Sequence, residues 1–325
     1  MMSRKDKKDA GQSTARRWKA AFFGSDKRLR TGWWLAICVA VYMVLSLIVR
    51  LGLGALYAAL FETWGINAAN VHRAPGWARL IYAWHGSSIT VAVSAAVIGA
   101  SAGLRRLWMR ERAALLRPGR YCGYATGMGM VCAILSAALF LLLDSMRLEW
   151  PLSAPNLSAA MPALWIIALF GAFAEEAFNK GVVFDGVCRK WGTVGATVCA
   201  CLLFFMTNGG YAGNVLCAVN VLLMGWVCCA LYTRHGLWAS VGFRWGWSLG
   251  SVFLLGFGNA SESVYRLYYV SDAWLTGGAA GPIYGSWMTL LLAGLLLWLN
   301  WKQASRIGRN LCGRIAKAVL RNRAV

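Results

Sequence analysis

Long apolar runs separated by short polar segments dominate this chain. A membrane-spanning helix needs about 20 predominantly apolar residues, and the sequence offers eight such segments, the fifth of them short. They are, to within a few residues, 33–60, 79–103, 121–145, 161–184, 193–208, 213–232, 236–257 and 282–301. In lipid such runs must satisfy their backbone hydrogen bonds internally, which favours helices and gives no support to regular β structure. The pattern therefore predicts an all-α polytopic bundle with about eight transmembrane helices.

The distribution of basic residues sets the predicted orientation. With the N-terminus inside, the cytoplasmic segments hold 26 of the 33 Lys and Arg residues, and the outside segments hold four. The cytoplasmic segments are 1–31, 104–120, 185–192, 233–235 and 302–325. This asymmetry follows the positive-inside rule, and an odd number of spans would break it. We therefore predict a multi-pass protein of the cell membrane with both termini cytoplasmic.

Composition agrees with a membrane protein. Hydrophobic residues make up 59% of the 325 residues and charged residues 14%, with a mean hydropathy of +0.53. A soluble domain would carry roughly a quarter charged residues, so a disordered chain, a coiled coil and an ordinary cytosolic enzyme are excluded. The net charge of +21 does not indicate nucleic acid, because the basic residues cluster around the apolar runs. The ten cysteines form no CxxC pair and are expected to be packing residues.

Both ends of the chain are predicted to lie at the membrane surface. Residues 1–31 form a basic cytoplasmic arm suited to anionic lipid headgroups. In the tail 302–325, apolar residues recur every four positions among Lys and Arg, which is typical of an interfacial amphipathic helix. The simpler interpretation is that both ends only set the topology and contact lipid. The transmembrane bundle between the two ends is predicted at 32–301, and no linker divides it.

The strongest chemical signal is a pair of adjacent carboxylates at membrane depth, Glu175 and Glu176. Neighbours on a helix point about 100° apart, so the two side chains cannot share one proton as a facing dyad would. Lys180 lies four residues after Glu176 on the same helix face, where an ion pair forms readily. Arg50, Lys180 and Arg244 fall within predicted spans, and a cation in lipid normally faces the bundle interior and has a partner.

Three polar positions farther along are expected to join the glutamates in one polar core. Asn208 ends the fifth span, Arg244 lies midway along the seventh, and Ser248 follows Arg244 by one helical turn. Taken singly, Asn and Ser often serve only as hydrogen-bond partners between membrane helices.

These residues resemble the motifs of the CAAX-protease and bacteriocin-processing membrane family, which includes type II CAAX prenyl endopeptidases and lysostaphin-resistance-like proteins. The resemblance covers 161–257, and more loosely a core domain of about 161–290. The family pattern EExxxR followed by Gly is matched by EEAFNKG at 175–181, and FxxxH by FFMTN at 204–208. The third pattern, His-x-x-x-Asn after a GLWxxIGF-like stretch, is matched by GLWASVGF at 236–243 and RWGWS at 244–248. A GGxxGPE-like turn is matched by GGAAGP at 277–282.

The resemblance implies an intramembrane endopeptidase in which a first-motif glutamate, helped by His, activates water, while His and Asn of the other motifs steady the oxyanion. Glu175 and Glu176 match the family glutamates, and Lys180 stands at the Arg position. Asn208 and Arg244 replace both histidines, and Ser248 replaces the Asn. This copy is therefore degenerate at its catalytic positions.

The replacements change the expected chemistry. Histidine can take up and release a proton near neutral pH, whereas Arg remains protonated. Arg244 is expected to pair with Glu175 or Glu176, and Lys180 with the other, which gives a charge-neutral network. Such a set is a poor divalent-metal site, and we expect no metal or other cofactor. His85 is the one candidate for a substitute histidine, although a packing role is the simpler interpretation.

Three functional interpretations remain open. The first is an endopeptidase that cuts prenylated-type or leader peptides, with proteolysis weak or lost. The second is a non-catalytic relative, a pseudoenzyme that serves as a scaffold, immunity or regulatory protein and binds a peptide partner. A transporter is the third and most remote, because inverted repeats and paired interrupted helices are not evident.

Overall fold

The computed structural model describes residues 30–109, 119–149, 161–208, 214–257 and 263–301. These residues are predominantly helical, which confirms the all-α class, and they divide into two compact units. The first unit includes the chain up to 113 together with 181–199. The second includes 114–180 and the chain from 200 onward.

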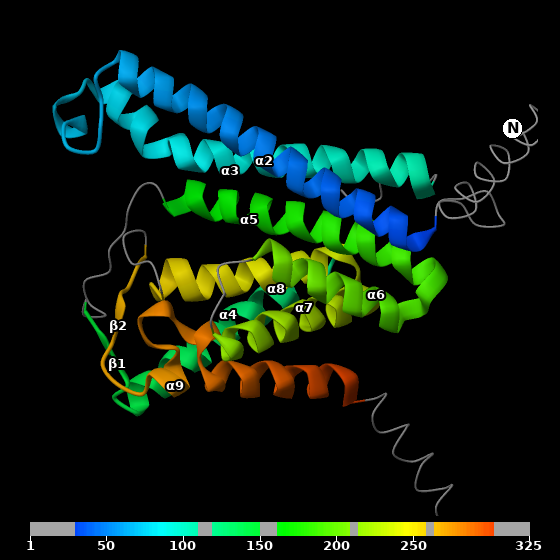
Figure 1. Cartoon of the computed structure of the whole chain (residues 1–325). Coiled ribbons are helices and arrows are strands. Elements are labelled where there is room, and N and C mark those ends of the chain that lie inside the picture. The colour runs from blue at the N-terminus through cyan, green and yellow to red at the C-terminus, as the bar shows by residue number, and fades with distance from the viewer. Residues whose placement is uncertain (1–29, 110–118, 150–160, 209–213, 258–262, 302–325) are drawn as a thin grey trace, which may run out of the picture. The chain divides into compact units, whose positions relative to one another are not determined.

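Two long helices form most of the first unit. Helix α2 (Thr31–Thr63) packs along α3 (Gly76–Leu104), and the loop between them contains the 3-10 turn η1 (Val71–Arg73) (Figure 1). The hydroxyls of Tyr57 on α2 and Ser88 on α3 are hydrogen-bonded at 2.7 Å. Both helices are apolar and long enough to cross a membrane.

The histidine of α3 lies among aromatic rings of both helices. The ring centroid of His85 lies 5.9 Å from that of Tyr57 and 5.4 Å from those of Phe61 and Tyr82. Its Nδ1 lies 2.5 Å from the carbonyl oxygen of Tyr82. These contacts favour the packing role for His85 over a role in proton transfer.

A buried arginine ties the end of α3 to the other segment of the first unit. Arg105 begins the π-helical turn η2 (Arg105–Met109). Its guanidinium donates to the carbonyl oxygen of Gly181 at 2.6 Å and to Oδ2 of Asp185 at 2.9 Å. One basic residue of the predicted cytoplasmic segment 104–120 thus has a structural role.

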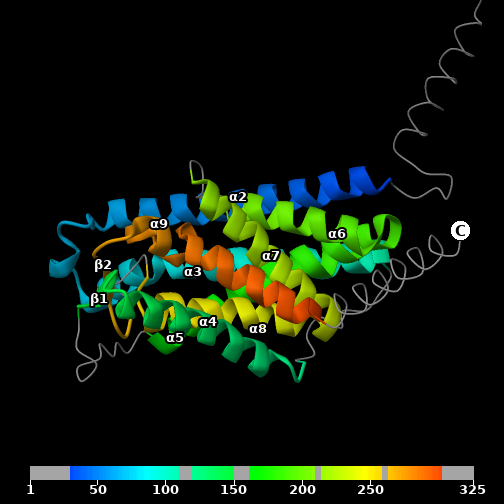
Figure 2. The same cartoon turned by 90° about the horizontal axis from the view of Figure 1, so that it is seen from below.

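The second unit is arranged around α8 (Leu237–Ser248). This helix packs against α4 (Cys122–Leu142), α5 (Met161–Phe178) and α7 (Val215–His235) (Figures 1 and 2). A shorter apolar helix, Ser286–Trp301, adds side chains to the same core. The largest side chains fully buried there are Leu231, Phe243, Met288 and Leu292.

Glycines allow α8 to approach α4 very closely. A Cβ on Gly246 would overlap the backbone carbonyl of Thr126, and one on Gly242 would lie 2.5 Å from the carbonyl oxygen of Cys122. Small residues spaced by four are typical of membrane helices in backbone contact. Because Ser240 and Arg244 lie on the same helix, this close contact also helps to position the polar residues described below.

A two-stranded ribbon corrects the expectation that the chain contains no regular β structure. Strand β1 (Met146–Leu148) pairs antiparallel with β2 (Leu267–Tyr269). Both strands lie in segments predicted to connect spans, where water can satisfy the outer strand edges. The expectation of helices alone therefore holds for the apolar runs but not for these loops.

The glycine-rich segment at 277–282 forms the turn that its sequence suggested. Gly277 and Gly281 have φ angles of 82° and 92°, which only glycine adopts readily. The short helix α9 (Ala273–Thr276) precedes this turn, the 3-10 turn η6 (Gly278–Ala280) lies within it, and the 3-10 turn η7 (Pro282–Tyr284) begins at its last residue. The buried side chain of Asn220 on α7 donates to the carbonyl oxygens of Ile283 and Gly285, which fixes the segment after the turn.

Every predicted span coincides with helical structure, but the number of crossings stays a prediction. Among the described residues, five helical segments are long and apolar enough to cross a membrane, and one of them, Met161–Thr207, covers the predicted fourth and fifth spans. It contains α5, the π-helical turn η4 (Asn179–Phe184) and α6 (Asp185–Thr207). Gly192 interrupts α6 with a φ of 69°, within the predicted connecting segment 185–192. The cytoplasmic placement of both termini also stays a prediction.

Two predicted elements lie outside the described residues. They are the basic arm, apart from its last two residues, and the amphipathic tail 302–325.

Candidate functional site: a buried ion network

Four charged side chains of the second unit meet between α5 and α8. Glu175 and Glu176 lie in the last turn of α5, directly before the π-helical turn η4, and Arg244 lies on α8. Lys180 belongs to η4. Single π-helical turns inside α-helices occur frequently at functional sites.

The inner part of the network is completely buried. The side chains of Glu176 and Lys180 both have 0% exposure, and Nζ of Lys180 lies 3.3 Å from Oε2 of Glu176. The hydroxyl of Ser240 donates to the same Oε2. A buried ion needs a partner of opposite charge, and here each ion has one.

The outer part of the network is partly accessible. Nη1 of Arg244 lies 2.5 Å from Oε2 of Glu175 and 3.6 Å from Oε1 of Glu176, so one guanidinium contacts both carboxylates. The exposed fractions are 17% for the side chain of Arg244 and 32% for that of Glu175. The ring of Phe204, on α6, lies 4.7 Å from the guanidinium carbon and 5.6 Å from Nζ of Lys180. Phe204 therefore forms cation–π contacts with both cations.

The predicted pairing of charges is confirmed by this geometry. Arg244 binds Glu175 and touches Glu176, while Lys180 binds Glu176. The formal charges of the four groups sum to zero. Oε1 of Glu176 and Nζ of Lys180 have ion-pair partners but no hydrogen bond among the described residues. Every charged group of the network therefore has a partner of opposite charge, although not every polar atom has a hydrogen bond.

A comparison with protein families identifies the segment that contains this network. Residues 157–250 match the family model described as type II CAAX prenyl endopeptidase Rce1-like. This segment is Rce1-like. The match confirms the resemblance inferred from the motifs, and together with the apolar helices it identifies the chain as a membrane protein. Searches of the curated proteins and of the solved structures return no match.

Two of the predicted site residues in the Rce1-like segment do not join the network. The side-chain amide of Asn208 donates to the carbonyl oxygen of Phe204 on its own helix at 2.8 Å. Ser248 ends α8, and no hydrogen bond among the described residues links its hydroxyl to the glutamates. The shared polar core is therefore smaller than expected: it holds both glutamates and both cations but lacks Asn208 and Ser248.

The structure adds contacts that the sequence analysis missed. Ser240 lies one helical turn before Arg244, on the same face of α8, so its spacing could have suggested a place in the network. Asn179, next to Lys180, donates its side-chain amide to the carbonyl oxygen of Ala200 at 3.0 Å. This bond ties the π-helical turn of the Rce1-like segment to α6.

The expectation that Arg50 faces the interior of the bundle and has a partner is wrong. The side chain of Arg50 on α2 is exposed and forms no ion pair within the described part of the chain. Helix α2 is apolar on all sides, so nothing in its sequence directs Arg50 toward an interior.

The ion network offers poor ligands for a metal ion. Among the described residues, no three His, Cys, Asp or Glu side chains lie close enough together to hold one. The carboxylate oxygens of Glu175 and Glu176 are already in contact with Arg244 and Lys180. A divalent cation would have to displace these cations, so the donor set does not fit a metal.

Proposed function

We propose that this chain is a multi-pass protein of the cell membrane whose Rce1-like site binds a peptide and hydrolyses it weakly or not at all. The contact of 2.5 Å between Arg244 and Glu175 carries this proposal. This contact places the permanently charged guanidinium of Arg244 against the carboxylate of Glu175, which is the more exposed of the two glutamates.

General base catalysis requires a carboxylate that can accept a proton from a nearby water. Glu175 is engaged by Arg244, and Glu176 is engaged by Lys180, Ser240 and Arg244. Arginine cannot take up the proton in place of histidine because its guanidinium stays protonated. Both glutamates therefore have their carboxylate oxygens in contact with cations and are poorly placed to activate water.

Stabilisation of an oxyanion is also weakened. An oxyanion site needs donors aimed at the oxygen on which negative charge develops. Arg244 donates to a carboxylate, and Asn208 donates to a helix carbonyl. At both positions that match the family histidines, a donor is therefore already engaged within the protein.

Peptide binding remains compatible with this arrangement. The pair of Glu175 and Arg244 is partly exposed, so a polar group of a peptide could contact it without entering the buried part of the network. Prenylated CAAX-type peptides and leader peptides are the proposed partners, by similarity to the family. The same exposure favours one alternative, an active endopeptidase in which a bound peptide draws Arg244 away from Glu175.

A cleavage assay tests the proposal. Detergent-purified protein is incubated with a library of prenylated CAAX-type and leader peptides, and the products are measured by mass spectrometry. We expect product formation at most slightly faster than that of the Glu175→Gln/Glu176→Gln double variant, together with measurable photo-crosslinking of a peptide to the wild type.

Two outcomes would contradict the proposal. Rapid cleavage by the wild type that the double substitution abolishes would establish the active endopeptidase instead. Failure of all peptides to crosslink, in protein whose melting curve shows that it is folded, would remove the peptide-binding role.

A further inference from the structure

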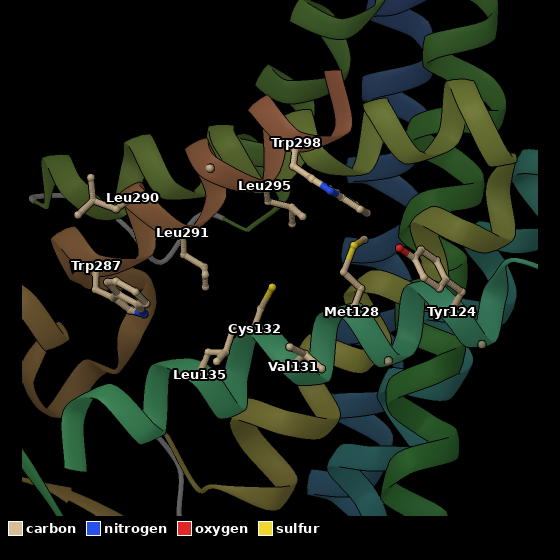
Figure 3. Close-up of a pocket in the computed structure, with 13 residues that line it drawn as sticks. Tyr124, Met128, Val131, Cys132, Leu135, Trp287, Leu290, Leu291, Leu295 and Trp298 are labelled. Carbon is tan, nitrogen blue, oxygen red and sulfur yellow. The ribbon is translucent and has the colours of Figure 1, made fainter. Parts of the chain in front are cut away.

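An open apolar groove lies on the second unit, between α4 and the helix Ser286–Trp301. Its volume is about 750 Å³, within the range of about 300–1,000 Å³ found for ligand sites. Figure 3 shows side chains of the two helices facing one another across it, with Tyr124 and Trp298 at one end and Trp287 at the other. This groove is formed by other residues than the ion network.

Glycines give the groove its depth. Gly123 and Gly127 on α4 and Gly294 on the facing helix all line it. A Cβ added at any of these three positions would meet no atom within 4 Å. These glycines therefore leave space rather than allow close packing of the two helices. The remaining lining is almost entirely apolar, so the groove suits a hydrocarbon ligand.

The length of the groove matches one leaflet of a bilayer. On α4 it extends from Gly123 to Leu135, which is about 18 Å at 1.5 Å per residue. Half of a hydrocarbon core about 30 Å thick is about 15 Å. A single lipid tail inserted from one leaflet would therefore run along the groove.

Basic residues gather at the end of the groove marked by Tyr124 and Trp298. Arg120 precedes α4 and lies over the ring of Tyr121, which in turn lies 4.4 Å from the ring of His235 at the end of α7. Next to His235, Arg234 donates to Oδ1 of Asn300 at 2.9 Å, two residues beyond Trp298. Arg120 and Arg234 are exposed, and within the described residues neither forms an ion pair. This end lies on the side predicted to be cytoplasmic.

From these observations we infer that the groove binds an anionic phospholipid. One acyl chain occupies the apolar groove, and the phosphate lies against Arg120 and Arg234. Basic residues near the membrane surface attract anionic lipids, and aromatic residues such as Tyr124 and Trp298 favour the interface between headgroups and tails. A phospholipid supplies both the hydrocarbon that suits the groove and a counter-charge for the two cations.

Native mass spectrometry of the purified full chain tests this site. The protein is incubated with equal amounts of phosphatidylglycerol and phosphatidylcholine, and the bound lipid is measured. We expect phosphatidylglycerol to be retained at least about tenfold more than phosphatidylcholine, since each of two cations contributes to its binding. The variant Arg120→Gln/Arg234→Gln should lose this preference.

Filling the groove tests the position of the tail. Gly127→Leu and Gly294→Leu should each reduce retained phosphatidylglycerol at least about tenfold, because each side chain would project into the open space. The matched control is Gly54→Leu on α2, another helical glycine with open space around it, which should bind lipid as the wild type does.

Several results would overturn the inference. Unchanged lipid binding by both leucine variants would contradict the position of the tail, and equal retention of the two lipids would contradict the role of the cations. Retention of soluble glycerol phosphate equal to that of phosphatidylglycerol would indicate a phosphate site without a tail. Loss of a dimer in the leucine variants, without loss of bound lipid, would assign the groove to a second copy.

Discussion

Replacing Lys180 with Met is expected to lower the free energy of unfolding by about 3–5 kcal/mol. Breaking a buried ion pair by removing one partner has an effect of this size, because the remaining charge stays buried without compensation. Glu176 would keep the hydroxyl of Ser240 and the contact of 3.6 Å with Arg244, but it would lose the cation 3.3 Å from its Oε2. Equilibrium denaturation of the purified protein in mixed micelles measures the change.

Two control variants separate charge from packing at Lys180. Glu176→Gln/Lys180→Met removes both charges and should recover most of the lost stability, since replacing a whole buried pair by neutral groups is often tolerated. Arg50→Met removes an exposed cation of α2 and should change stability by less than about 0.5 kcal/mol. A loss below about 1 kcal/mol for Lys180→Met would contradict the buried pair.

Replacing Gly246 with Ala is expected to destabilise the second unit by about 1–3 kcal/mol or more. The added Cβ would overlap the backbone carbonyl of Thr126, so α8 and α4 would have to move apart. Overpacking of a well-packed contact has this cost even when flexible side chains can adjust, and here the obstacle is backbone. The melting temperature of the purified variant measures the effect.

Gly127 supplies the matched control for this substitution. It is a helical glycine of α4 with open space where a Cβ would lie. Ala is favoured over Gly inside a helix by up to about 1 kcal/mol, so Gly127→Ala should leave stability unchanged or raise it. Equal destabilisation by the two alanine variants would argue against the close contact between α4 and α8.

The ion pair within one helical segment could be predicted because its geometry is local. Lys180 follows Glu176 by one helical turn, and this spacing alone brings the two side chains together. The contact between Glu175 and Arg244 joins two helices. It could be predicted only because both residues occupy matching positions in motifs of a known family.

The outer members of the polar core could not be predicted from the same motifs. Asn208 can satisfy its amide on a carbonyl of its own helix, a local bond that competes with any contact across the bundle. Ser240 joins the network and Ser248 does not, although the two serines lie at equal distances of four residues before and after Arg244. Only the way α8 packs on its neighbours determines which serine faces Glu176.

Residues whose environment depends on packing were also poorly predicted. Helix α2 has no polar face, so its sequence did not indicate that Arg50 would be exposed. In contrast, glycines 242, 246 and 250 recur every four residues, and this spacing is a recognisable signal for close helix contact. The number of spans depends on short segments such as Ser286–Trp301, whose length alone does not decide whether they cross the membrane.

The central claim is that Arg244 neutralises Glu175 within one ion network, and a double-mutant cycle tests it most directly. Unfolding free energies are measured for the wild type, Glu175→Gln, Arg244→Gln and the double variant. If the network is as described, the two substitutions are coupled by more than about 1 kcal/mol, since contacting charged residues give non-additive effects. Additive effects within about 0.3 kcal/mol would mean that the two side chains do not interact, and the account of lost hydrolysis would fail.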